Sequence, residues 1–141
     1  MKKIILTIIL FTTSISLSSQ TIFGKWNSKN VDTGEIDSVI EVYMKEGKAF
    51  AKIVEIKDTR RQSAVCDLCT GKNKDKPILG LNILTGLEKD EDEWSGGKIL
   101  DPRNGKIYKC YIQLDGANKL KIRGYIGLAL LGKTAFWERS E

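Results

Sequence analysis

The chain has 141 residues, of which 41% are hydrophobic, and carries a formal net charge of +5 with no histidine. The lack of histidine excludes Ser-His-Asp and Cys-His catalysis and histidine-dependent zinc sites. Basic and acidic residues are interspersed, and no basic stripe with interleaved aromatic residues occurs, so no nucleic-acid partner is expected.

Residues 1–20 have the features of a secretory signal peptide: two early lysines, an apolar run over 4–11 and small residues before position 20. The apolar run is about half of the ~20 residues that a membrane-spanning helix needs. We therefore predict export, with cleavage within 18–20, to the periplasm or the exterior. Residues 21–141 then form a single domain with a net charge of +3, since Lys2 and Lys3 are removed.

Short segments in which apolar and polar residues alternate, separated by turn residues, fill most of the predicted domain. The sharpest turn is Asp101-Pro102 followed by Asn104-Gly105, because proline presets φ and Asn-Gly accepts positive φ. Eight strands without a convincing helix predict an all-β fold, a small antiparallel up-and-down β-barrel without free edges. The predicted strands begin at Gly24-Lys25-Trp26 and continue with 38–45, 48–57, 77–87 (bent at Gly80), a segment ending near Leu100, 106–114, 119–125 and 134–139.

Two of the three cysteines form a Cys-x-x-Cys motif, Cys66 and Cys69, in a long polar loop predicted over 58–76. A disulfide between them is the favoured state in an oxidising compartment, with a redox role or free thiols as alternatives. A thioredoxin-like role requires a strand–helix context that is missing here, and structural zinc requires four ligands. No metal or other cofactor is therefore expected, and Cys110, in a predicted strand, is expected to be a buried free thiol.

Residues 127–134 match the phosphate-loop pattern G-x4-G-K-T. That motif requires a long helix after it, whose N-terminus holds the phosphates. Only seven residues follow Thr134, and they alternate as a strand, with Ala135, Trp137 and Arg139 on one face. The segment is therefore predicted to be an apolar turn between two strands, without nucleotide binding.

Asp101 and Arg123 are the charged residues with the most specific predicted roles. Asp101 can accept backbone N–H bonds within its own turn, a structural role. Arg123 shares a strand face with Tyr125, and that face can lie outside or inside the barrel. If it lies inside, Arg123, Tyr125 and Tyr108 can meet a ligand head group, and the guanidinium favours a carboxylate such as that of a fatty acid.

The sequence resembles the bacterial family known as domain of unknown function 2147 over nearly all of residues 21–141. The resemblance implies an exported, lipocalin-like barrel without established enzymatic activity; the family typically has arginine where Lys133 stands. The matching features are Gly24-x-Trp26, Lys76-Pro77-Ile78-Leu79-Gly80-Leu81, Ile83-Leu84-x-Gly86-Leu87, Trp94-x-Gly96-Gly97-x-Ile99-x-Asp101-Pro102-x-x-Gly105-Lys106-x-Tyr108, Arg123-Gly124-Tyr125-x-Gly127, Leu131-Gly132-Lys133-Thr134 and Trp137-x-Arg139.

A further resemblance, to lipocalins, concerns the two chain ends. Lipocalins open with Gly-x-Trp, and a basic residue near the last strand packs over that tryptophan. Trp26 and Arg139 are expected to fill these structural roles through a cation–π contact.

The leading functional hypothesis is a non-enzymatic binding protein that holds a hydrophobic small molecule or fatty acid. It is expected to be a monomer or dimer, and peripheral association with the envelope is left open. The alternative is an envelope interaction or stress component whose barrel is filled by its own side chains. An enzyme using Asp101, Arg123 and tyrosines is the third hypothesis.

Overall fold

The computed structural model describes residues 20–128 and 131–140. The predicted signal segment, apart from its last residue, lies outside the described residues. Within the described ranges, no helix has the length and apolar character needed to cross a membrane.

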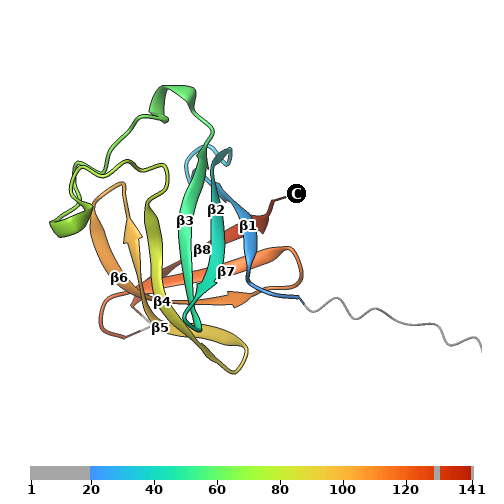
Figure 1. Ribbon diagram of the computed structural model, residues 1–141. Helices are drawn as coiled ribbons and strands as arrows, with labels where there is room; N and C mark the ends of the chain where they lie inside the picture. Colours follow the sequence, from blue (N-terminus) through green and yellow to red (C-terminus); the bar gives the residue numbers. More distant parts are fainter. Residues whose placement is uncertain (1–19, 129–130, 141) are drawn as a thin grey trace, which may run out of the picture.

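The described chain forms a closed barrel of eight antiparallel strands, each paired with its neighbours in sequence, and β1 pairs with β8 to close it (Figure 1). This confirms the predicted all-β, up-and-down barrel. The strands are β1 (Gly24–Lys29), β2 (Ile36–Lys45), β3 (Lys48–Ile56), β4 (Asn82–Asp90), β5 (Glu93–Asp101), β6 (Lys106–Leu114), β7 (Lys119–Tyr125) and β8 (Gly132–Arg139).

The fourth strand is displaced from its predicted position. It begins after the bend at Gly80, which has a φ of +87°, and runs on to Asp90. The chain joins the sheet here because Gly80 N–H donates to Ile53 O and Ile53 N–H donates to Leu81 O, at 2.7 and 3.1 Å. The segment 77–81 therefore belongs to the loop. The acidic run over 88–93 contains the turn of the β4–β5 hairpin, with Glu91 at a φ of +56°.

The core lies inside the barrel, where alternate residues of each strand meet. Its largest fully buried side chain is Trp26, and the other fully buried members are mostly aliphatic. The main cluster includes Trp26, Val42, Leu84, Leu87, Trp94, Ile112, Leu120 and Trp137. Burial of this apolar surface, at about 25 cal/mol per Å², is the main force that stabilises the barrel.

The 25-residue β3–β4 connection contains two short 3-10 turns, Thr59–Arg61 and Gly71–Asn73, and arches over the β5–β6 turn (Figure 1). A disulfide joins Cys66 to Cys69 with a Cα–Cα distance of 5.3 Å, which confirms the predicted bond. Both cysteines are buried in a second small apolar cluster with Leu81 and Leu100. The disulfide thus packs the loop onto the end of β5.

Cys110 is a buried free cysteine on β6, and burial raises the pKa of its thiol to about 12. The thiolate is the reactive form, so a protonated thiol reacts slowly with alkylating agents.

In the unfolded, unreduced protein we expect one reactive thiol, and three after reduction. In the native protein at pH 8 Cys110 should resist iodoacetamide for as long as the fold persists. Mass spectrometry of the alkylated protein measures all three states, and a Cys110 bridge to either other cysteine would contradict the assignment.

Candidate ligand-binding site

The barrel has two different ends, and the alternating chain direction decides which loops lie at each. The β1–β2, β3–β4, β5–β6 and β7–β8 connections gather at one end, here called the mouth. The β2–β3, β4–β5 and β6–β7 turns gather at the other, here called the closed end, together with the start of β1 and the end of β8.

The closed end is sealed by Trp26 and Arg139. The Arg139 guanidinium carbon lies 4.2 Å from the centroid of the fully buried Trp26 ring. Its Nε donates to Ala117 O at 2.9 Å, and its Nη2 donates to Thr21 O at 2.8 Å. The indole Nε1–H of Trp26 in turn donates to Ile22 O at 2.9 Å. The guanidinium therefore holds the segment before β1, the end of β8 and the β6–β7 turn over one aromatic ring.

A cavity of about 600 Å³ occupies the mouth half of the barrel and opens between its loops. This volume lies within the ~300–1,000 Å³ that is typical of small-molecule sites. Its deep wall is apolar and comes from six strands; the residues there are Ile40, Ile53, Ile83, Ile99, Ile122, Ala135 and Trp137. An aliphatic group placed there would exchange water for hydrocarbon surroundings.

The cavity is widened at Gly124 and Ala135, because glycine has no side chain and alanine has only a methyl group. Gly124 pairs with Cys110 of β6, and Ala135 pairs with Ile122 of β7. The nearest atoms to a methyl group at Gly124 would be side-chain carbons of Ile99 and Tyr108, at 3.5 and 3.8 Å. Small residues on β7 and β8 therefore leave part of the interior unfilled.

The rim of the cavity is predominantly cationic. Four basic side chains and two carboxylates line it: Lys29, Arg61, Arg103, Lys133, Asp37 and Asp101. Lys29 Nζ is 2.8 Å from Glu138 Oε1, and Arg103 binds Asp101. Among the described residues, no ion pair within 4.0 Å involves Lys133 or Arg61, so these two cations are the best placed to meet an anionic ligand.

Asp101 organises the β5–β6 turn as predicted from its sequence. Its carboxylate accepts from the Arg103 backbone N–H at 3.0 Å and from Arg103 Nε and Nη2 at 2.9 and 2.8 Å. Burial acts to raise the Asp101 pKa, but these bonds and the charges of Arg103 and Lys133 outweigh it and lower the pKa. Asp101 thus stays ionised and holds Arg103 at the rim.

Of the three predicted ligand-binding residues, the structure brings two to the cavity. Tyr108 faces inward from β6, with its hydroxyl accepting from Asn104 Nδ2 at 3.1 Å, and Tyr125 lines the cavity at the end of β7. Arg123 lies on the outer face, where Nη1 donates to Thr134 Oγ1 at 2.8 Å. Of the two orientations left open for this face, the outer one is therefore observed, and the expected role of Arg123 in the cavity is wrong. Ile122 faces the cavity instead, because burying isoleucine is favourable whereas burying a guanidinium is costly.

Lys133, which sequence reasoning did not include in the site, takes the position expected of Arg123. It lines the cavity from β8, two residues before Ala135 and four before Trp137. The strand alternation that places Ala135, Trp137 and Arg139 on one face extends back to Lys133. That extension was the signal that could have identified it. Among the described residues, no cluster of three or more cysteine, aspartate or glutamate side chains could hold a metal ion.

The closed eight-stranded barrel, its sealed end and its open cavity define a lipocalin-like β-barrel whose cavity has the size of a small-molecule site. A similar solved structure is protein HP1028 from the human pathogen Helicobacter pylori, described as belonging to the lipocalin family. The two chains are 20% identical with a TM-score of 0.74, over 86% of this chain and 84% of that chain. The chain belongs to DUF2147, a family described as an uncharacterized protein conserved in bacteria, whose model matches residues 24–139. No curated protein matches this sequence.

Proposed function

We propose that this protein is an exported, non-enzymatic binding protein that holds an amphipathic molecule with an aliphatic chain and an anionic head group. The observation that carries the proposal is the 600 Å³ cavity, which has an apolar interior and a rim with twice as many cations as carboxylates. The aliphatic chain would occupy the interior beside Ile122 and Trp137. The head group would remain at the rim near Lys133 and Arg61, where it keeps part of its hydration.

The alternative of a barrel filled by its own side chains finds less support, because an unfilled volume of this size is costly unless something occupies it. Export is supported by the Cys66–Cys69 disulfide, since such bonds persist in oxidising compartments. A fatty acid fits the proposal in chemical class, with its carboxylate as the anionic group.

Filling the cavity should weaken ligand binding. Ala135→Trp projects an indole into the interior from β8, and we expect the affinity for 11-(dansylamino)undecanoic acid to fall about 30-fold (roughly 2 kcal/mol). The matched control is Phe136→Trp, which adds an indole to the outer face of the same strand and should leave affinity unchanged. Fluorescence titration measures both. If the wild-type protein does not bind the probe, the binding function is wrong and the interaction hypothesis takes its place.

The head-group position has its own test. Lys133→Gln removes a rim cation, and we expect about tenfold weaker binding of dodecanoate (~1.4 kcal/mol) with little change for dodecanol, which has no charge. Arg123→Gln is the control, since Arg123 lies on the outer face. Calorimetric titration of both ligands measures the difference. Equal losses of affinity for dodecanoate and dodecanol would show that Lys133 does not interact with the charge of the head group.

A further inference from the structure

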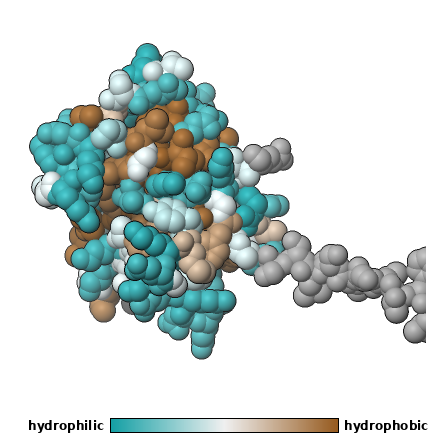
Figure 2. Space-filling model, in the orientation of Figure 1, coloured by the Kyte–Doolittle hydropathy of each residue, from teal (hydrophilic) through white to brown (hydrophobic). Residues whose placement is uncertain are grey.

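Exposed apolar side chains gather at one end of this barrel. Eleven large apolar side chains are exposed among residues 20–128 and 131–140, and nine of them lie in mouth loops or in the first two residues of strands that start there. Only Met44 and Phe136 lie elsewhere. Figure 2 shows part of this distribution: apolar surface lies beneath the long β3–β4 loop, bordered by hydrophilic residues.

The four most exposed of these side chains form what is here called the apolar rim. Val31 of the β1–β2 loop is 77% exposed, and Ile126, Leu128 and Leu131 of the β7–β8 connection are 70%, 67% and 73% exposed. Val31, Ile126 and Leu131 also line the cavity entrance. Large aliphatic groups so fully in contact with water are unfavourable unless they meet another apolar phase.

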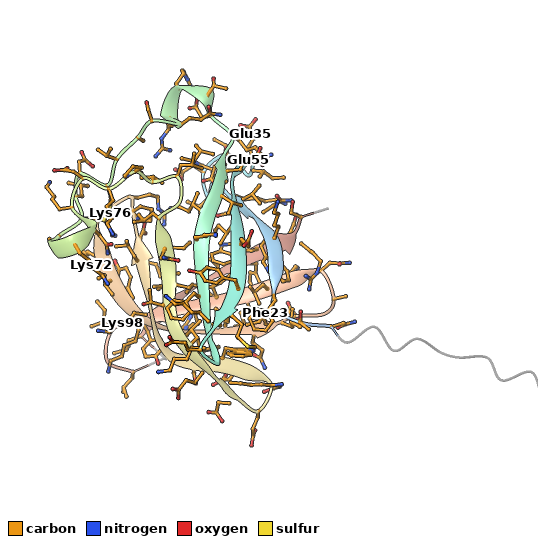
Figure 3. All side chains as sticks on the ribbon, viewed as in Figure 1. Phe23, Glu35, Glu55, Lys72, Lys76 and Lys98 are labelled. Carbon is orange, nitrogen blue, oxygen red and sulfur yellow. A yellow bond between two sulfur atoms is a disulfide. The ribbon has the colours of Figure 1, made fainter. Side chains whose placement is uncertain are left out.

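The charges of the two ends are opposite. The mouth segments 29–37, 57–81, 101–106 and 126–133 contain ten basic and seven acidic residues. The closed-end segments 20–25, 45–48, 88–93, 115–119 and 138–140 contain six basic and eight acidic residues. Figure 3 shows Lys72 and Lys76 of the β3–β4 loop along one side of the molecule, with Lys98 of β5 below them. The barrel is thus an electrical dipole with its positive end at the mouth.

We propose that the mouth docks onto the surface of an anionic lipid bilayer, with the apolar rim entering the acyl boundary and the excess basic residues of the mouth, most of them in the β3–β4 loop, meeting the headgroups. Such an interface favours exposed aliphatic side chains at an end of the molecule with a net positive charge, and each lysine near an anionic surface adds to the attraction. A soluble protein partner would match the apolar rim less well, because its surface has no mobile hydrocarbon to receive four separate side chains. The purpose of docking rests on the proposed function. With the mouth on the bilayer, the cavity entrance would face the acyl chains, and a ligand would pass between the bilayer and the cavity without crossing water.

The test is co-sedimentation of the protein with vesicles of phosphatidylglycerol and phosphatidylcholine in equal parts. Leu128→Ser should weaken partition about tenfold, because one inserted leucine is lost. Leu128 does not line the cavity, so binding of the dansyl probe in vesicle-free buffer should be unchanged. Met44→Ser removes a 55% exposed side chain near the closed end and should leave partition unchanged.

Charge is tested separately. Replacing Lys72 and Lys76 with glutamine should weaken partition about tenfold or more, and the same change at Lys45 and Lys89 near the closed end should not. Raising the salt concentration should weaken partition, since screening shortens the reach of the charges. Equal binding to pure phosphatidylcholine vesicles, equal loss in the Leu128 and Met44 variants, or no binding to vesicles would each overturn the docking proposal. Vesicle binding without probe binding would overturn the proposed ligand and leave docking intact.

Discussion

Replacing Trp26 with alanine is expected to lower the free energy of unfolding by about 3–5 kcal/mol, the cost of removing a large fully buried side chain. The loss has three sources in this structure. The core cluster loses its largest fully buried member, the Ile22 carbonyl loses the indole donor, and the Arg139 guanidinium loses the ring beneath it. Denaturant unfolding followed by circular dichroism measures the change.

Arg139→Ala separates the cation from the ring and should cost less, about 1–3 kcal/mol, because it removes the cation–π contact and hydrogen bonds to Ala117 and Thr21. The double variant with Trp26→Ala should cost less than the sum by about 0.5–2 kcal/mol, which is the coupling between the two side chains. Strict additivity would mean that the contact contributes nothing to stability. Trp26→Phe is the matched control, since it keeps an aromatic ring but not the indole donor.

Gly105→Ala is expected to destabilise the protein by about 2–4 kcal/mol, combining backbone strain with overpacking. Gly105 has a φ of +71°, and a methyl group there would overlap the Leu68 carbonyl group of the disulfide loop. The loop would have to lift from the β5–β6 turn, so we also expect faster trypsin cleavage between Lys72 and Lys76. Thermal unfolding and timed proteolysis measure the two effects.

Gly116→Ala isolates the backbone part of that cost. Gly116 has a φ of +80° in the β6–β7 turn, and a methyl group there would have no neighbour within 4 Å. This variant should therefore lose only about 1–2 kcal/mol and keep the trypsin resistance of the loop. Similar losses for Gly105 and Gly116 would show that contact between the loop and the turn does not stabilise the fold.

The barrel could be predicted because its signals are local. Turn residues such as Asn104-Gly105 separate short runs in which apolar and polar residues alternate. The resemblance of Gly24-x-Trp26 to lipocalins predicted the contact between Trp26 and Arg139. The contact between Leu68 and Gly105 could not be predicted in this way. Those residues are 37 positions apart, and only the folded arrangement shows that the glycine permits close approach of the loop.

The orientation of β7 stayed open in the sequence analysis, and the expected ligand-binding role of Arg123 depended on it. In 119–125 the aliphatic residues Leu120 and Ile122 alternate with lysine and arginine, so desolvation alone places the aliphatic face inside. An inward Arg123 would have needed a carboxylate or an anionic ligand nearby to offset that cost. Lys133 escapes the same penalty because it stands at the rim, where its ammonium group stays in contact with water.

Pairing of the first strand with the last has a consequence for how this protein reaches its native state. Trp26 pairs with Arg139 across more than a hundred residues, and Arg139 is the last residue of β8. Contacts of such long sequence separation form late and slow the folding of β proteins. Until β8 has been synthesised and released, β1 and β7 remain open edges that can pair with other chains. The nascent barrel therefore depends on rapid delivery of its final strand, and its greatest exposure to aggregation falls in that interval.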